Sequence, residues 1–340
     1  MPTLAAYFDT SSASFLFKKD KKNIAFSTFP YVYSKSLFGN QCSENEFCQS
    51  ILNMILEDNK VKGSKCDLVL SSFGDPPEFS IKPKFKVGIQ DLVKDCDDYF
   101  PVVITGTSYV TPNATLFSSC RSDLEERNPD EQNDALEDLC IYPQAITSDI
   151  SIQSEIDKKI ILGVLPGLKT DNKNNILFSG GRFFRRIVNK ELDYILILEL
   201  IKKPGVYNIF IDRNNSFPLI QSMKMYDKSS DIDIEDYIEN IGTFICCGGS
   251  VECLLKTSVG EDQFIQIEKD RVDIVPLKLG SPAKIHIKNS TLGSLDLHTK
   301  GGEVGIVFDT RVSRGSIYSN TKLFNECVRQ FGKGFSKDKK

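Results

Sequence analysis

The apolar residues at the start of the chain fall into short runs separated by polar turns. Leu4–Phe8 and Ala13–Phe17 each have the length and apolar character of a buried strand. Asp9–Ser12 lies between them and consists of turn-forming residues. Asn23–Phe29 follows a run of lysines and predicts a third strand. The opening of the chain therefore predicts a three-stranded meander.

A helix and further strands are expected next. Ser43 and Glu46 form a capping box, and apolar residues follow at helical spacing, at Phe47, Ile51, Met54 and Ile55. Short buried strands are then predicted at Asp67–Ser71, Phe100–Thr105, Ile160–Leu165 and Ile176–Ser179. Residues 121–140 contain eight acidic residues and a proline. This density of charge favours an exposed loop or a short solvated helix, with a partner-binding surface as the less favoured alternative.

Residues 175–218 form the most informative stretch of the chain. A predicted strand leads into Gly180-Gly181, then a Leu-rich helix at Leu192–Leu200 and a second strand that ends at Asp212. Glycine has no Cβ, so a diglycine lets the backbone approach a large flat group such as a nucleoside. Tight packing of the strand against the helix explains the diglycine equally well.

The pattern changes after Ile234–Cys247, which we predict to be a helix followed by apolar residues. Short alternating segments with Gly and Pro turns then predict a small all-β module, either a sandwich or a barrel. These segments are Val251–Lys256, Gln263–Glu268, Val272–Leu277, Lys284–Lys288, Ser294–Thr299 and Gly305–Asp309. The predicted domains are therefore residues 1–248, a β-rich module at 249–315, and a C-terminal helix with a basic tail at 316–340.

Composition excludes several classes of function. A net charge of −4 disfavours nucleic-acid binding through phosphate neutralisation. No run approaches the ~20 apolar residues of a membrane span, and the start of the chain lacks the basic region of a signal peptide. We therefore expect a cytoplasmic protein with no membrane span. Ten irregularly spaced cysteines without a Cys-x-x-Cys pair, and only His286 and His298, favour buried free thiols and no metal site.

The order β-β-β-α-β is how each half of an actin-like (ASKHA) ATPase begins. In such proteins the first turn cradles phosphates, so Asp9 is the candidate catalytic residue, which would orient a metal or a water. Thr10, Ser11 and Ser12 would hold phosphate, and Gly180 with Gly181 would contact adenosine; the implied cofactor is ATP with Mg²⁺. Ser11 stands where these loops usually have glycine, and an ordinary hairpin turn is the alternative.

The second phosphate loop of a working ATPase, Asp-x-Gly-Gly-x-Thr, is not found. The nearest fragments are Thr105–Ser108 and Thr147–Asp149, and neither fits. Without that loop, the electrostatic clamp on a metal-bound triphosphate lacks its second half. Asp309 and Arg311 form a sequence-local pair, which we interpret as a solvated ion pair of little energetic weight.

Two segments resemble the glutamate mutase accessory family (GlmL/MutL). The first carries Phe178–Gly181, Pro204–Val206 and Ile211-Asp212, and the second is Val272–Arg314 with its Gly-Gly-x-Val-Gly strand. Val312-Ser313 interrupts the Arg-Gly turn of that family's pattern. The resemblance implies an actin-like fold and an accessory role beside adenosylcobalamin-dependent mutases.

The resulting fold prediction is an α/β actin-like (ASKHA, ribonuclease H-like) two-lobed domain with a C-terminal small all-β module. The favoured function is that of a GlmL-like accessory protein, non-catalytic or weakly nucleotide-binding, which acts through a protein partner. The alternatives are a genuine ATP-hydrolysing reactivating factor and an actin-like pilus or division scaffold. The sequence leaves the oligomeric state open.

Overall fold

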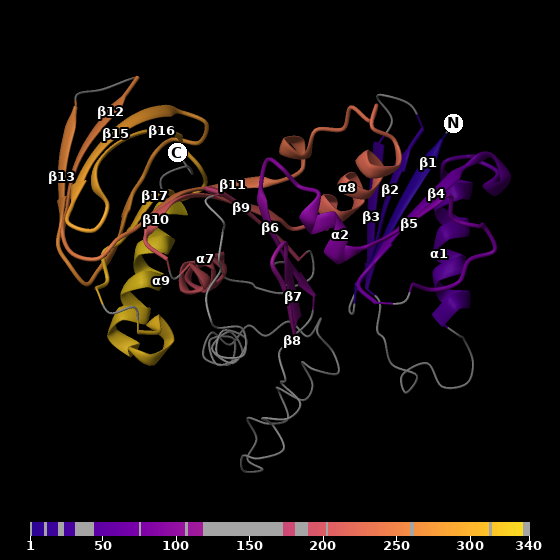
Figure 1. The fold of residues 1–340 in the computed structure, drawn as a ribbon, viewed down its shortest axis with the longest axis horizontal. Helices are drawn as coiled ribbons and strands as arrows, with labels where there is room; N and C mark the ends of the chain where they lie inside the picture. Colours follow the sequence, from indigo (N-terminus) through magenta and orange to yellow (C-terminus); the bar gives the residue numbers. More distant parts are fainter. Residues whose placement is uncertain are drawn as a thin grey trace, which may run out of the picture.

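The chain folds into three mixed or antiparallel β-sheets with helices packed against two of them (Figure 1). This computed structural model describes residues 2–9, 12–19, 24–30, 44–74, 76–105, 108–117, 173–180, 190–201, 203–258, 262–312 and 315–335. The predicted acidic loop at 121–140, the strand at 160–165 and the end of the basic tail lie outside them. Among the residues described, no helix combines the length and the apolar character that crossing a membrane requires.

The first sheet has the order β3-β2-β1-β4-β5. Its strands are β1 (Thr3–Phe8), β2 (Ser12–Lys18), β3 (Ile24–Pro30), β4 (Asp67–Ser72) and β5 (Phe85–Gly88). β1 pairs antiparallel with β2 and parallel with β4, and β4 pairs parallel with β5. β1 is buried on both faces, which explains its continuous apolar sequence. The strands predicted in this part of the sequence are confirmed.

Helix α1 (Glu44–Asp58) covers the outer face of this sheet. Its buried stripe is made by Cys48, Ile51, Leu52, Ile55 and Leu56. Met54, which we expected in that stripe, is 42% exposed. The buried stripe thus keeps the predicted Ile51 and Ile55 and uses Cys48, Leu52 and Leu56 instead of Met54, since a cysteine can occupy a core position.

The second sheet is larger and has the order β14-β17-β11-β10-β9-β6-β7-β8. The strands are β6 (Phe100–Thr105), β7 (Ser108–Thr111), β8 (Ala114–Phe117), β9 (Asn175–Ser179), β10 (Gly205–Asp212), β11 (Glu239–Cys246), β14 (Val272–Val275) and β17 (Gly305–Asp309). Within it, β6 pairs antiparallel with β7 and parallel with β9, and β9 pairs parallel with β10. The part β8-β7-β6-β9-β10 therefore repeats the order and the strand directions of the first sheet.

Helices pack on both faces of the large sheet. Helix α7 (Lys190–Leu200) is buried from Leu192 onward, because it lies between the sheet and α9 (Thr321–Phe335). On the opposite face, α2 (Ile89–Lys94) and α8 (Ser216–Tyr226) lie between the two sheets (Figure 1). Their shared core contains Val69 from the first sheet and Leu177 from the second. Residues far apart in sequence thus meet around α8.

The third sheet is antiparallel, with the order β13-β12-β15-β16. Its strands are β12 (Val251–Thr257), β13 (Gln263–Ile267), β15 (Pro282–Asn289) and β16 (Gly293–Lys300). The inner face packs on Ile245, Ile306 and Phe308 of the large sheet. All six predicted segments are strands, but β14 and β17 belong to the large sheet. Part of the predicted β-rich module at 249–315 therefore belongs to the large sheet.

The predicted helix within Ile234–Cys247 is wrong. Only a 3₁₀ turn, η3 (Ile234–Asp236), precedes strand β11. Gly242 occupies a bulge in that strand at φ 145, and a Cβ there would lie 2.2 Å from the carbonyl oxygen of Gly305. This close backbone contact requires glycine, and the run pairs with β10 and β17 as a strand.

The described cysteines are buried and free, as the irregular spacing predicted. They are Cys48, Cys66, Cys96, Cys246, Cys247, Cys253 and Cys327. Burial raises the pKa of the Cys66 and Cys253 thiols to about 11. These thiols therefore behave as small apolar core residues rather than as nucleophiles.

Candidate functional site

Polar side chains gather where parallel strands of the two sheets end. β1 ends next to Asp9, β9 ends at Ser179 and β10 ends at Asp212. The carboxyl ends of parallel strands are the usual position of ligand sites in open α/β sheets. We call Asp9, Ser12, Ser14, Ser179, Asp212 and Asn215 the strand-end cluster, and all six are at least 95% buried.

Asp9 closes the turn between β1 and β2. Its Oδ1 accepts a hydrogen bond from the backbone N–H of Ser12 at 2.6 Å, and its Oδ2 accepts from the Ser12 hydroxyl at 2.8 Å. The backbone N–H of Asp9 donates in return to the carbonyl of Ser12 at 3.0 Å. The predicted site residues Asp9 and Ser12 are thus together, as an Asp-closed hairpin turn.

Asn215 joins this turn to helix α8. Its side-chain amide donates to Oδ2 of Asp9 at 3.3 Å and to the hydroxyls of Ser12 and Ser14, both at 3.1 Å. Asn215 adopts a left-handed conformation at φ 56, which asparagine tolerates better than most residues. One amide therefore ties the first sheet to the helix that follows β10. Sequence reasoning missed this residue.

Asp212 caps the other side of the same helix start. Its carboxylate accepts backbone hydrogen bonds from Asn214, Ser216 and Phe217 at 2.8–3.0 Å, and one from the Ser179 hydroxyl at 2.7 Å. A carboxylate suits a helix N-terminus because the helix dipole is positive there. Burial raises the pKa of Asp212, and these hydrogen bonds oppose the rise. Asp212 was predicted only as the end of a strand.

The remaining predicted site residues divide into two groups. Gly180 is buried, and its backbone N–H donates to the carbonyl of Asp212 at 3.4 Å, which places it beside the strand-end cluster. Thr10, Ser11 and Gly181 lie outside the described residues. Their roles therefore stay predictions.

The turn between β6 and β7 takes the same place in the second sheet as the Asp9 turn takes in the first. Thr105 pairs with Ser108, while Gly106 and Thr107 lie outside the described residues. The sequence fragment nearest to a second phosphate loop therefore stands at the expected topological position. It carries no carboxylate, unlike the Asp9 turn.

The described residues of the cluster do not assemble a ligand set for a magnesium ion, and its two carboxylates serve protein donors. All four oxygens of Asp9 and Asp212 accept hydrogen bonds from protein groups. No cluster of three His, Cys, Asp or Glu side chains that could hold a metal occurs in the part of the chain that the structure describes. The described cluster also pairs its two carboxylates with neutral donors. A further anion would therefore be held weakly there.

A second buried polar cluster lies at the opposite end of the large sheet, and we call it the Arg311 cluster. The guanidinium of Arg311 donates two hydrogen bonds to Asp309 and one to Glu199, all at 2.8 Å, and one to the carbonyl of Gly315 at 3.1 Å. Burial alone would lower the pKa of Arg311, but its contacts with Asp309 and Glu199 raise it above the ordinary value. The interpretation of Asp309 and Arg311 as a solvated pair is wrong.

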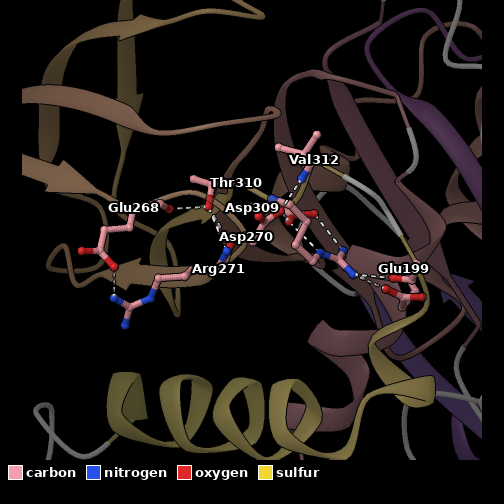
Figure 2. Close-up of polar contacts among 9 residues, drawn as sticks. Glu199, Glu268, Asp270, Arg271, Asp309, Thr310 and Val312 are labelled. Atoms are coloured by element: carbon pink, nitrogen blue, oxygen red, sulfur yellow. Dashed lines mark hydrogen bonds and ion pairs between the residues drawn. The ribbon is translucent and has the colours of Figure 1, made fainter.

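Figure 2 shows how the Arg311 cluster continues toward the surface. The Thr310 hydroxyl donates to the carbonyl of Glu268 at 2.7 Å and accepts from the backbone N–H of Arg271 at 3.0 Å. The backbone N–H of Val312 donates to Asp270 at 3.0 Å. These contacts hold the turn after β17 against the turn before β14. The cluster thus joins α7, β17 and the loop at 268–271, and its role is structural.

No protein-family model matches the sequence, and no curated protein matches it significantly. The solved structures similar to the chain include (R)-2-hydroxyglutaryl-CoA dehydratase component A from Acidaminococcus fermentans. It is 10% identical, with a TM-score of 0.35 over 65% of this chain and 96% of that chain. The Aquifex aeolicus Ppx/GppA phosphatase gives 10% identity and a TM-score of 0.27, over 53% of this chain and 68% of that chain.

An exopolyphosphatase from Cytophaga hutchinsonii gives 8% identity and a TM-score of 0.28 over 76% of each chain. Likenesses at this level assign neither an activity nor a ligand to the chain. The function must therefore be argued from its own residues.

Proposed function

We propose that this protein has a two-lobed actin-like fold, binds a nucleotide weakly at the strand-end cluster and acts, without hydrolysing the nucleotide, through a protein partner. The finer form of the proposal is an accessory protein of the GlmL type, which assists an adenosylcobalamin-dependent mutase.

The repeated sheet order supports the fold. β1 to β5 and β6 to β10 follow the same spatial order with the same strand directions, and α2 and α8 pack between the two sheets. Two successive sheets with the same strand order and the same strand directions fit the plan of an actin-like protein. Asp9, after β1 of the first sheet, and Gly180, after β9 of the second, are then joined through Asn215 and Asp212.

One observation supports the non-catalytic part of the proposal, namely that the Asp9 carboxylate is buried and hydrogen-bonded to protein groups. Asp9 is 5% exposed, and its oxygens accept hydrogen bonds from Ser12 and Asn215. A general base must lie within hydrogen-bond reach of the proton that it removes, and the burial of Asp9 among protein donors disfavours that role. Asp9 instead closes the turn and joins it to α8. The binding of a nucleotide at this turn would therefore be coupled to the position of α8.

The first experiment measures nucleotide binding and hydrolysis on the same protein. We expect millimolar ATP to raise the melting temperature, since a ligand at 100 times its dissociation constant stabilises the native state by about 2.7 kcal/mol. The rise should not depend on Mg²⁺, and release of phosphate should stay at the rate of the buffer alone. Gly181→Val should abolish the rise, whereas Gly332→Val, a glycine substitution in α9, should preserve it.

Two results would overturn this proposal. A melting temperature unchanged by millimolar ATP would contradict nucleotide binding. Hydrolysis that Asp9→Asn abolishes would make the protein an ATPase. For the accessory role, sedimentation of the protein mixed with a purified cobalamin-dependent mutase should give a complex that ATP strengthens or weakens. Independent sedimentation at every nucleotide concentration would contradict that role.

A further inference from the structure

A cavity of about 590 Å³ lies between the large sheet and the four-stranded sheet, and we call it the sheet pocket. This volume is within the usual range for a small-molecule site. Asn175 opens β9 and lines the pocket, whereas Ser179 closes β9 and belongs to the strand-end cluster. The two sites therefore occupy different ends of the same strand.

One wall of the sheet pocket is set by a row of polar residues on the large sheet. Asn175, Asn208 and Thr243 lie directly opposite one another in the adjacent strands β9, β10 and β11. The Asn208 amide donates to Oδ1 of Asn175 at 2.9 Å, and Oδ1 of Asn208 accepts from the Thr243 hydroxyl at 3.1 Å. The neighbouring row on the same face, Val206 and Ile245, is apolar and packs under the four-stranded sheet. The polar row thus begins where the apolar core between the two sheets ends.

The facing wall, on the four-stranded sheet, is made of small side chains. Thr257, Ala283 and Thr299 lie opposite one another in β12, β15 and β16 and line the pocket. The next row on the same face is larger and apolar, with Leu255 opposite Ile285, and it fills the space between the sheets. Small residues in the row of Ala283 leave that space open. The cavity therefore follows from the residues that the register places together.

The protein uses only part of the hydrogen-bonding capacity of the pocket. A side-chain amide offers two N–H donors and an oxygen with two lone pairs. In the part of the chain that the structure describes, Asn208 uses one N–H and one lone pair, and the side chain of Asn240 makes no hydrogen bond. A donor and an acceptor therefore remain at each of these residues for a ligand.

Phe210 supplies an apolar surface beside these amides. It lies opposite Asn240 in the register and lines the pocket. Its half-buried ring packs edge-on against the ring of Tyr99, with centroids 5.2 Å apart, and this contact fixes its position. A fixed aromatic ring offers a face on which the C–H groups of a bound ring can pack.

The basic residues that border the pocket direct their side chains away from it. They are Lys256, Lys284, His298 and Lys300. Each neighbours an inward-facing residue of its strand, and successive side chains of a strand point to opposite faces of the sheet. The described lining thus presents amides, hydroxyls and an aromatic ring to the cavity. A charged ligand would lose its hydration there without gaining a counter-ion.

We infer that the sheet pocket binds an uncharged polyhydroxyl ligand of the size of a mono- or disaccharide. Each hydroxyl of such a ligand both donates and accepts, as do the remaining groups of Asn208 and Asn240. The C–H face of its ring packs on Phe210. The site does not depend on the nucleotide proposed for the strand-end cluster, and it is tested without nucleotide.

Saturation-transfer difference NMR tests this inference, because it detects ligands that bind with millimolar affinity. The probes are D-glucose, D-galactose, D-mannose, maltose and myo-inositol, with adenosine and citrate as an uncharged and an anionic comparison. We expect at least one of the polyhydroxyl probes to receive saturation from the protein in a saturable way. The transfer should be strongest at the C–H protons of one ring face, which would lie against Phe210.

Three variants locate the binding. Asn240→Ala should raise the dissociation constant of the bound probe by about fivefold or more, because the hydrogen bonds of its amide are lost. Ala283→Leu extends the large apolar row into the pocket and should abolish binding. Asn325→Ala, which changes an exposed asparagine of α9, should leave the dissociation constant unchanged. Circular dichroism shows which variants are folded.

Three results would show that the inference is wrong. The first is the absence of saturation transfer to every polyhydroxyl probe. The second is binding of adenosine or citrate without binding of the polyhydroxyl probes. The third is equal binding by Asn240→Ala and Asn325→Ala, and this pair decides the matter even where Ala283→Leu does not fold. The thermal shift with ATP is a separate measurement, so failure of one proposal leaves the other standing.

Discussion

The strand-end cluster and the Arg311 cluster compensate their buried negative charges with different kinds of donor. Asp9 and Asp212 are compensated by neutral donors, namely backbone N–H groups, hydroxyls and one amide. Asp309 and Glu199 are compensated by a full positive charge on Arg311. Neutral donors leave net negative charge at the strand-end cluster, whereas the Arg311 cluster holds one cation between two anions. The first cluster can therefore respond to pH, while the second fixes the position of three elements.

The largest effect should follow from removing the cation of the Arg311 cluster. Arg311→Met leaves two buried carboxylates without a partner and should destabilise the protein by roughly 3–5 kcal/mol. Because the chain has no Trp, urea unfolding is best followed by circular dichroism. The matched control is Arg271→Met, since Arg271 is 41% exposed and its ion pairs measure 3.5–3.6 Å. That change should cost about 0–1 kcal/mol, and equal losses would show that the Arg311 cluster carries no special weight.

A smaller and pH-dependent effect is expected from Asp212→Asn. At low pH both side chains are uncharged, but the NH₂ group of the amide cannot accept the hydrogen bonds made at its position, so the loss should be about 1–3 kcal/mol. The pKa of Asp212 is raised in the folded state, so the wild type is favoured most below the ordinary value of 3.8. Its advantage over the variant should shrink as pH rises through the folded-state pKa.

The control for this pH dependence lies at the other end of α8. The hydroxyl and backbone N–H of Ser229 lower the pKa of Asp227, so the stability that Asp227 contributes is lost as pH falls through the folded-state pKa. The advantage of the wild type over Asp227→Asn should therefore grow as pH rises from 3 to 7 in thermal melts, opposite to the trend for Asp212→Asn. The same pH trend in both variants would contradict the assignment for Asp212.

Asn215→Gly tests the link between the two sheets. Glycine keeps the left-handed backbone but removes an amide that donates to Asp9, Ser12 and Ser14, and the expected loss is about 1–2 kcal/mol in urea unfolding. Lys60 has the same backbone conformation at φ 54, so Lys60→Gly measures the backbone contribution alone and should be neutral or stabilising. Equal effects of the two variants would show that the amide contributes nothing.

The smallest effect concerns the hydroxyl of Tyr7, which is buried and has no hydrogen-bond partner in the described part of the chain. Burial, with the nearby charges of Asp9 and Asp212, raises its pKa well above the ordinary value. Tyr7→Phe should therefore be neutral or stabilising by up to about 1 kcal/mol. Tyr194→Phe removes a hydroxyl that donates to Glu303 at 2.8 Å and should be destabilising. A clear loss from Tyr7→Phe would mean that its hydroxyl has a partner after all.

Sequence patterns predicted the parts of this fold that depend on local apolar runs. The strands around Asp9 and those around Gly180 are examples, because each is a buried run bounded by turn residues. Helix α8 was missed, since its start at Ser216-Phe217-Pro218 resembles a loop. The available signal was a proline within the first helical turn, preceded by Asp212 and Asn215. β11 was mistaken for a helix because its conformation depends on pairing with β10 and β17, which are distant in sequence.

The site was predictable only as far as neighbouring residues define it. Asp9 and Ser12 are three positions apart, so turn chemistry brought them together in the prediction. Asn215 and Arg311 act on residues 206 and 112 positions away, and no spacing rule connects them. Whether a polar residue becomes part of a buried network depends on which elements pack together, and that is settled by the tertiary fold.

The hydrogen bond between Asn215 and Asp9 has a consequence for the order in which the newly synthesised chain can fold. Because synthesis proceeds from the N-terminus and domains begin to fold in that order, the first sheet emerges long before its closing amide. Until residue 215 arrives, the Asp9 turn lacks its donor from α8, and closing a loop of this length slows folding. The first five strands therefore lack the contacts of Asn215 with Asp9, Ser12 and Ser14 until residue 215 has been synthesised.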